Sequence, residues 1–208
     1  MLLTVHVQLL QQALTGKVSP RALGDIISAN LHQDSLRYQF GHDEFHFDNN
    51  AFAAGRAYIE SQRLLIQPAL QAGEAAQARA AFGRLSHTAQ DFYAHTNYVD
   101  LWLNAHSAGS ASSAIDPLDS EILNDPRLHS GRLYYPQEAL YFIPFLRKFS
   151  LSILPPDSHA HMNLDSAGQG RGFEYAFHAA LKRTLMEFEL VRSLLPAGLF
   201  TVFTDLET

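Results

Sequence analysis

The sequence contains no cysteine, so it can form neither disulfide bonds nor thiolate metal sites. No stretch of it approaches the roughly 20 consecutive apolar residues that a membrane-spanning helix needs, so no transmembrane segment is expected. Basic side chains are few, since 15 Lys and Arg stand against 21 Asp and Glu and give a formal charge of −6. This balance disfavours an extended phosphate-binding surface, and nucleic acid is therefore not an expected partner.

The N-terminal segment MLLTVHVQLLQQAL lacks the basic residues that open a secretory signal peptide. Gln8, Gln11 and Gln12 interrupt its apolar residues, which is typical of an amphipathic helix rather than of a signal. A cytoplasmic protein is therefore the expectation, although export without a cleavable signal stays open. The sequence does not fix the oligomeric state.

The chain has 208 residues, of which 47% are hydrophobic, and this suits a single domain. Alternation with a period of two is weak, whereas stretches rich in Ala, Leu, Gln and Arg favour helices. The predicted helices cover residues 2–14, 20–36, 50–72, 74–104, 135–153 and 172–194. The segment 105–134 is rich in Ser, Gly, Asp and Pro and is predicted to form a long loop or lid. We expect an all-α, single-domain helical bundle over residues 1–208.

Histidine is plentiful, with 11 copies. In RLSHTAQDFYAHTNYVDLW, residues 84–102, His87, Asp91 and His95 follow one another at intervals of four. At about 100° per residue these side chains form one stripe along a helix. Two buried imidazoles beside a carboxylate need partners, and a metal ion would satisfy all three. Imidazole and carboxylate ligands suit zinc, with iron or manganese as alternatives.

Two other segments concentrate possible ligands. ANLHQDSLRYQFGHDEFHFDN contains His32, Asp34, His42, Asp43, Glu44, His46 and Asp48. In DSHAHMNLDS, His161 and Asp165 stand four residues apart, as do His159 and Asn163, and His6 on the first helix is a weaker candidate. Each of these has a plainer explanation, because a lone His is usually a surface or core residue and the polar stretch after residue 40 could be a solvated turn.

Three stretches resemble a known family. GRLSHTAQDFYAHTNYVDL resembles the signature of the Het-C (heterokaryon incompatibility) proteins, and HFDNNAF and HMNLDSAGQGRGF resemble its other blocks in the same order, between residues 28 and 180. Those proteins are in turn similar, in their metal-binding pattern, to zinc-dependent phospholipase C and the zinc-dependent single-strand nucleases. The resemblance implies a helical bundle of that type with two or three zinc ions.

The resemblance also assigns roles to residues. The implied ligands are Asp34, His46, His87 and Asp91 for one zinc, His95, His161 and Asp165 for a second, and His6 with Asp91 for a third. Asp34 would act as general base and Asp91 would bridge two metals. From its chemistry, Arg171 in GQGRGF could contact a phosphate at a helix start. Asn97 beside the stripe is a second candidate for substrate binding.

The predicted function is a metal-dependent phosphoester hydrolase of the phospholipase C type, acting on a small phosphodiester or a phospholipid through a metal-activated water. Two alternatives stay open. One is a metalloenzyme of another class, such as an HD-type phosphohydrolase, an iron or manganese oxidase, or an enzyme of natural-product biosynthesis. The other is a non-catalytic helical module that uses the metal for structure or partner recognition. That module predicts closed coordination, whereas an enzyme keeps a position open for water.

Overall fold

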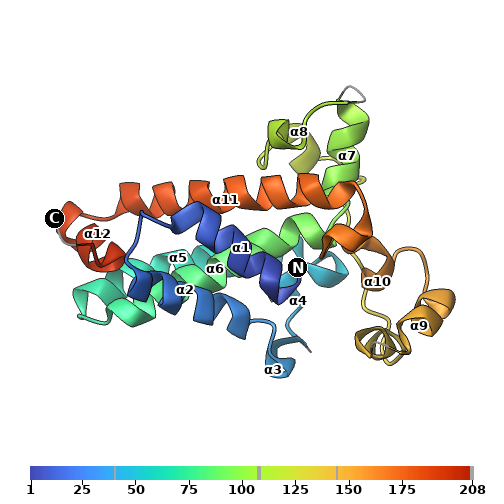
Figure 1. Ribbon diagram of the computed structural model, residues 1–208, viewed down its shortest axis with the longest axis horizontal. Helices are drawn as coiled ribbons and strands as arrows, with labels where there is room; N and C mark the ends of the chain where they lie inside the picture. The colour runs from blue at the N-terminus through green and yellow to red at the C-terminus, as the bar shows by residue number, and fades with distance from the viewer. Residues whose placement is uncertain (40, 107–108, 144, 207–208) are drawn as a thin grey trace.

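The computed structural model describes residues 1–39, 41–106, 109–143 and 145–206, and within them the chain forms helices and no strand, which confirms the all-α prediction (Figure 1). With η marking a 3-10 helix, the helices are α1 Leu3–Leu14, α2 Pro20–His32, α3 Leu36–Gln39, α4 Asp43–His46, η1 Asp48–Asn50, α5 Phe52–Gln71, α6 Ala75–His95, α7 Tyr98–Ala105, η2 Ser112–Ala114, α8 Ser120–Leu123, η3 Gln137–Phe142, α9 Arg147–Ile153, α10 His159–Met162, η4 Ala167–Gln169, α11 Gly172–Leu194 and α12 Ala197–Thr204. None of the described helices combines the length and the hydropathy that crossing a membrane requires.

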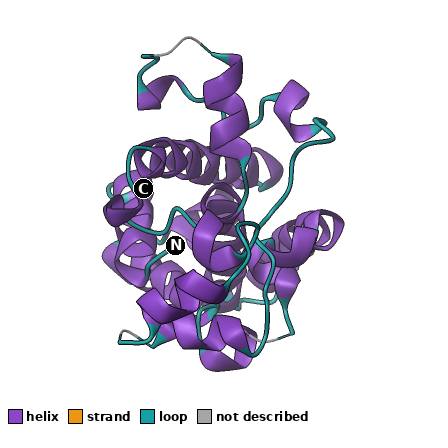
Figure 2. Cartoon of the chain, turned by 90° about the vertical axis from the view of Figure 1, so that its right-hand side faces the viewer, coloured by secondary structure: helices purple, strands orange, loops and turns teal. Residues whose placement is uncertain are grey.

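Helix α6 forms the centre of the bundle. It packs against α5, α2 and α11, and every residue from 85 to 95 is buried. Figure 2 shows the molecule from one end, with helices and connecting loops and no strand among the described residues. Polar side chains in this stretch have partners on neighbouring helices, as where the Gln90 amide donates to Thr184 Oγ1 on α11 at 3.0 Å. The stripe of His87, Asp91 and His95 therefore lies inside the bundle.

A glycine allows α2 to approach α6 closely. A Cβ atom at Gly83 would lie 2.4 Å from the carbonyl oxygen of Ile26 and 2.9 Å from the Cβ of Ala29. Only a residue without a side chain therefore fits this crossing. The close contact brings the end of α2, and Asp34 just beyond it, next to the histidine stripe of α6.

The helix predicted over 74–104 is interrupted at Thr96, so that prediction is wrong at this point. Thr96 has extended backbone angles, φ −117° and ψ 164°. Its hydroxyl donates to the carbonyl of Phe92 at 2.7 Å and accepts from the Tyr98 amide at 3.2 Å. The threonine thus closes α6 and starts α7, which projects above the bundle in Figure 1.

Segment 105–134 is packed against the core instead of lying free. The Tyr93 and Tyr98 hydroxyls donate to the carbonyls of Pro117 and Asp116, at 2.7 and 2.5 Å. The segment also contains the short helices η2 and α8. Residues 107 and 108 of this predicted loop lie outside the described residues, as do residue 40 of the polar stretch and residue 144 of the predicted helix 135–153.

Other helix predictions differ at their ends. The predicted helices 2–14, 50–72 and 172–194 correspond to α1, α5 and α11, with ends within two residues of those predicted. The predicted helix 20–36 ends earlier, at His32, where α2 gives way to a turn. The predicted helix 135–153 is divided into η3 and α9, and α12 was not predicted.

Candidate metal centre

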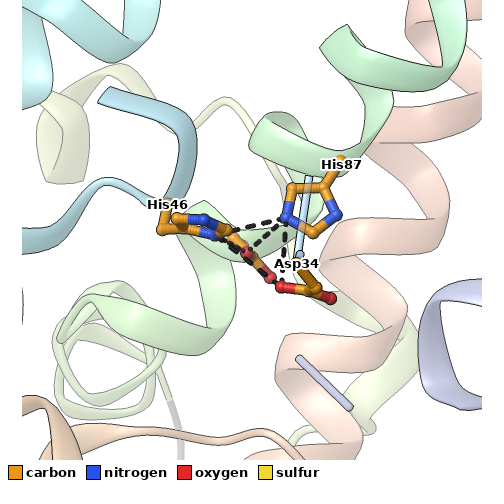
Figure 3. A group of neighbouring side chains, drawn as sticks. Asp34, His46 and His87 are labelled. Atoms are coloured by element: carbon orange, nitrogen blue, oxygen red, sulfur yellow. Dashed lines mark hydrogen bonds and ion pairs between the residues drawn. The ribbon is translucent and has the colours of Figure 1, made fainter. Parts of the chain in front are cut away.

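Four side chains from three helical segments converge on one point. Asp34 follows α2, His46 ends α4, and His87 and Asp91 lie one turn apart on α6. One ligand atom from each of these residues lies within 4.8 Å of the other three. Figure 3 shows Asp34, His46 and His87 pointing toward one another. We call this set the first group.

The spacing of the first group suits a tetrahedral ion. Asp91 Oδ2 lies 2.9 Å from His46 Nδ1 and 3.1 Å from His87 Nε2, and the two nitrogens are 3.2 Å apart. Asp34 Oδ1 lies 3.7 Å from the His87 nitrogen and 4.0 Å from the His46 nitrogen. A zinc ion with four bonds of about 2.0–2.1 Å holds tetrahedral ligand atoms about 3.3 Å apart. The observed separations bracket that value, so the residues fit such an ion.

Burial sets the charges of the first group. Burial alone would raise the pKa of the Asp91 carboxyl, but the Met1 ammonium and then His87 hold it well below its ordinary value. Burial also lowers the pKa of His87 to about 4, despite the nearby Asp91. Burial opposes protonation of His46 as well, but its hydrogen bond to Asp91 raises the pKa of that imidazole. The group therefore offers an anionic carboxylate and a neutral imidazole, the forms in which these side chains bind metals.

A strained turn separates His46 from Asp48. The non-glycine residues with positive φ in this turn are Phe47 at 60°, Asn49 at 52° and Asn50 at 59°. Asn adopts this conformation readily, whereas for Phe47 it costs about 1–3 kcal/mol and persists only where packing enforces it. The Phe47 ring lies so close to Gly55 that a Cβ there would be 2.7 Å away. This turn directs the His46 side chain toward the first group and the Asp48 side chain toward a neighbouring group.

The second group consists of Asp48, His95 and His159. His159 Nδ1 donates to Asp48 Oδ1 at 2.9 Å. Burial opposes protonation of His159, but Asp48 outweighs it and raises the pKa to about 9. His95 donates from Nδ1 to the carbonyl of His46 at 2.9 Å, and its Nε2 lies 3.2 Å from Asp165 Oδ1. The second group is thus built around an imidazolium–carboxylate ion pair.

The segment around Gly131 joins the parts of the second group through its backbone. Gly131 donates its amide hydrogen to the carbonyl of His95 and accepts one from Asn49, both at 2.9 Å. The His159 amide donates to the carbonyl of Arg132 at 2.9 Å. A Cβ atom at Gly131 would lie 2.6 Å from the Cα of His159. Glycine is therefore required where this segment crosses α10.

Two of the predicted ligands outside the first group lie close to these clusters. The His6 ring stacks on His87 with centroids 4.4 Å apart, and its Nδ1 donates to Gln90 Oε1 at 2.7 Å. Its Nε2 lies 3.3 Å from Asp91 Oδ1. Asp165 Oδ1 lies 3.2 Å from the Met1 amino nitrogen, in addition to its contact with His95.

His161 lies outside both groups, contrary to the prediction. It is exposed, and its Nε2 donates to the carbonyl of Leu151 at 2.9 Å. His159 occupies the position beside His95 that the sequence analysis had assigned to His161. Both histidines have a polar residue four positions later, so spacing on a four-residue helix could not distinguish them. The distant partner Asp48 makes the difference.

The two predicted substrate-binding residues also lie elsewhere. Arg171 is exposed and donates to the Tyr175 hydroxyl at 3.3 Å. The Asn97 amide donates to the carbonyl of Arg127 at 3.0 Å and accepts from the His129 amide at 2.8 Å. Both residues therefore form hydrogen bonds with nearby segments of the chain and do not contact either group.

A cavity of about 220 Å³ opens over the two groups. Its polar lining comes from both groups and their neighbours, and its apolar lining comes from the first residues of the chain and from the segment after Gly131. The lining residues are Met1, Leu2, Leu3, Asp34, His46, Asp48, His95, Leu133, Tyr135, His159 and Asp165. Arg171 and Asn97 are not among them. A small ion can therefore reach the first group from outside through Asp34 and His46.

The comparisons with known proteins point to one family. A sequence model of the VWA7 N-terminal domain matches residues 4–112. The von Willebrand factor A domain-containing protein 7 of Rattus norvegicus is 36% identical over 80 residues, and that of Homo sapiens is 35% identical over 80 residues. Each match covers 38% of this chain and only 9% of the relative's length. No solved structure matches the chain.

These matches overturn the family and the activity inferred from the motifs. The prediction of a Het-C-like protein related to zinc-dependent phospholipase C is wrong, because the matched family is a different one. The prediction of an enzyme, a metal-dependent phosphoester hydrolase, is wrong with it, because no hydrolase is named among these matches. His and Asp at intervals of four reflect the pitch of a helix. The spacing therefore indicated which side chains lie on one side of a helix and gave no information about a reaction.

Proposed function

The chain belongs to the VWA7 N-terminal domain family, and we propose that it is a non-catalytic helical module whose folded state is stabilised by a bound divalent metal ion. The ion is held by the first group, and zinc is the metal that its two imidazoles and two carboxylates suit best. Iron and manganese are the alternatives that the same ligand types allow. All four ligands fall inside the matched region 4–112.

The convergence of four ligand atoms within 4.8 Å is the observation that carries the proposal. Structural zinc sites have four protein ligands, whereas catalytic sites keep one position for water. A full set of protein ligands therefore supports a structural role. The ion would link the end of α2 and the end of α4 to the middle of α6 and would add to the hydrogen bonds that already join α4 and α2 to α6.

The chemistry of Asp91 supports a cation at this point. Its carboxylate is fully buried, and a buried charge is strongly unfavourable unless it is paired. In the described residues the ion pairs of Asp91 involve imidazoles and the Met1 amino group, and no Lys or Arg side chain. One of those imidazoles, His87, is neutral at pH 7 because its pKa is about 4. A divalent ion would add positive charge on the Oδ2 side of Asp91, away from the Met1 ammonium at Oδ1, and would use the lone pair of His87.

We propose a second cation position beside the first. His6 Nε2 and Asp34 Oδ2 are buried atoms without a hydrogen-bond partner in the described structure, and they face each other across 3.8 Å. His6 Nδ1 donates to Gln90, so Nε2 presents a lone pair toward Asp34 and toward Asp91 Oδ1, 3.3 Å away. A cation would relieve this repulsion. The Met1 ammonium, 2.5 Å from Asp91 Oδ1, would compete with a metal for this position.

Metal analysis tests the proposal. The purified chain is stripped with a chelator, analysed for bound elements before and after, and titrated with zinc by calorimetry. We expect tight binding that His87→Ala and Asp91→Asn abolish, because each removes a ligand of the first group. His161→Ala is the matched control, since its ring lies outside both groups, and it should bind as the unaltered chain does. His6→Ala should remove only the second equivalent.

Thermal unfolding gives an independent measurement. A ligand present at 100 times its Kd stabilises the folded state by about 2.7 kcal/mol. For a chain of this size about 1 kcal/mol shifts Tm by about 2–4 °C, so saturating zinc should raise Tm by about 5–11 °C. A chain that binds no metal, or a His87→Ala variant that binds and responds as the control does, would refute the proposed function.

A further inference from the structure

The end of the molecule formed by η3 and α9 carries exposed apolar side chains. These are Ile143, Phe145, Phe149 and Ile153, here called the α9 patch. Phe145 exposes 84% of its surface and Phe149 exposes 56%. Helix α9 projects away from the bundle at the lower right of Figure 1. Soluble proteins rarely gather exposed apolar groups of this size, and such patches usually mark an interaction surface.

The α9 patch is additional to the face that α9 already buries. Ser150 and Leu154 lie on the buried side of the helix, and Leu154 packs in a small cluster that includes Tyr141 and Ala160. Phe149 and Ile153 are four residues apart and therefore share a second side of the helix, about 100° from Ser150, that faces outward. The helix thus has one apolar side toward the protein and a second toward solvent.

The exposed charges within residues 135–154, the segment that carries the α9 patch, are positive. Arg147 and Lys148 are exposed, and the only acidic residue between positions 135 and 154, Glu138, is completely buried. Glu138 Oε1 accepts from the Ala160 amide at 2.7 Å. Arg147 lies over the Tyr141 ring, 4.4 Å from its centroid. In the described structure no carboxylate forms an ion pair with Lys148. This cationic surface stands out on a chain of net charge −6.

We propose that the α9 patch docks on a membrane surface that contains anionic lipids. Aromatic side chains combined with Lys and Arg on a short amphipathic helix are the features of segments that lie in the membrane interface. Phe145 and Phe149 insert between headgroups, while Lys148 contacts lipid phosphate and carboxylate groups. The charge complementarity favours this occupant over an apolar protein groove, and the projecting rings suit insertion. The proposal is independent of the metal centre.

Vesicle co-sedimentation tests the proposal with the full chain. Vesicles of phosphatidylcholine alone are compared with vesicles that also contain phosphatidylserine. We expect binding to the anionic vesicles that weakens as salt is raised. The double variant Phe145→Ser/Phe149→Ser should lower binding at least about tenfold, and Lys148→Glu about threefold or more. Circular dichroism is used to check that each variant is folded.

The matched control is Leu64→Ser/Leu65→Ser on α5, which removes two side chains that are 67% and 50% exposed. It should bind as the unaltered chain does. Three results would overturn the proposal. They are absence of binding to anionic vesicles, equal binding by the phenylalanine double variant, and a dimer in solution that this variant dissociates, which would assign the patch to a second copy of the chain. Lys148→Glu keeps the test decisive if the double variant fails to fold.

Discussion

Replacing Arg79 by methionine should strongly destabilise the protein, although Arg79 is not part of the candidate metal centre. Arg79 lies on α6 and is 3% exposed. Its guanidinium donates to the carbonyls of Phe203 and Val202, each at 2.9 Å, and to Asp25 Oδ2 at 3.0 Å. The two carbonyls belong to the last turn of α12, where a helix leaves its carbonyl groups unpaired. One side chain therefore caps α12 and binds it to α6 and α2.

The magnitude follows from these contacts. A hydrogen bond from a charged group contributes about 1.5–3 kcal/mol when its acceptor is buried. Phe203 is fully buried, whereas Val202 is 45% exposed and Asp25 is 32% exposed, so water can replace part of the last two bonds. We expect Arg79→Met to lower the free energy of unfolding by about 3–4 kcal/mol. Methionine keeps the apolar stem, so little packing is lost.

Urea unfolding followed by circular dichroism measures the effect. Arg56→Met on α5 is the control, because Arg56 is exposed, and it should change stability by no more than about 0.5 kcal/mol. Arg79→Lys should recover part of the loss, since it restores the charge without the planar fork. A loss below about 1 kcal/mol for Arg79→Met would show that water satisfies the α12 carbonyls and would refute the reasoning.

Two further predictions concern packing and pH. Gly83→Ala should cost about 1–3 kcal/mol in urea unfolding because its methyl group would press on the Ile26 carbonyl, whereas Gly24→Ala, with open space around it, should be neutral or slightly stabilising. Equal effects of the two would contradict the close α2–α6 contact. Zinc affinity should rise by up to about tenfold per pH unit between about pH 6 and 8. The raised pKa of His46 means that zinc must displace a proton there, whereas His87, with a pKa of about 4, is already unprotonated. A flat calorimetric titration series would exclude His46 as a ligand.

Local patterns predicted most of the long helices and the residues of the first group. The stripe on α6 could be recognised because a helix repeats every 3.6 residues. That His87 and Asp91 share one side of the helix follows from their spacing alone, without knowledge of residues elsewhere in the chain. The break at Thr96 could not be foreseen, because neither Gly nor Pro marks it and its partners are hydrogen bonds of the threonine hydroxyl. The choice of His159 over His161 depends on Asp48, more than a hundred residues away in the sequence. The spacing of residues along the sequence cannot predict long-range contacts of this kind.

The segment around Gly131 has a consequence for hydrogen exchange and for tolerance to substitution. Gly131, Arg132 and His159 each donate an amide hydrogen to a carbonyl of another segment, although Gly131 and Arg132 belong to no helix. Their amide hydrogens are released only when this loop separates from the end of α6 and from the segment around α10, so we expect the loop to exchange more slowly than other irregular segments. Because the contacts involve peptide groups, the exposed side chain of Arg132 is free to vary, whereas Gly131 is not.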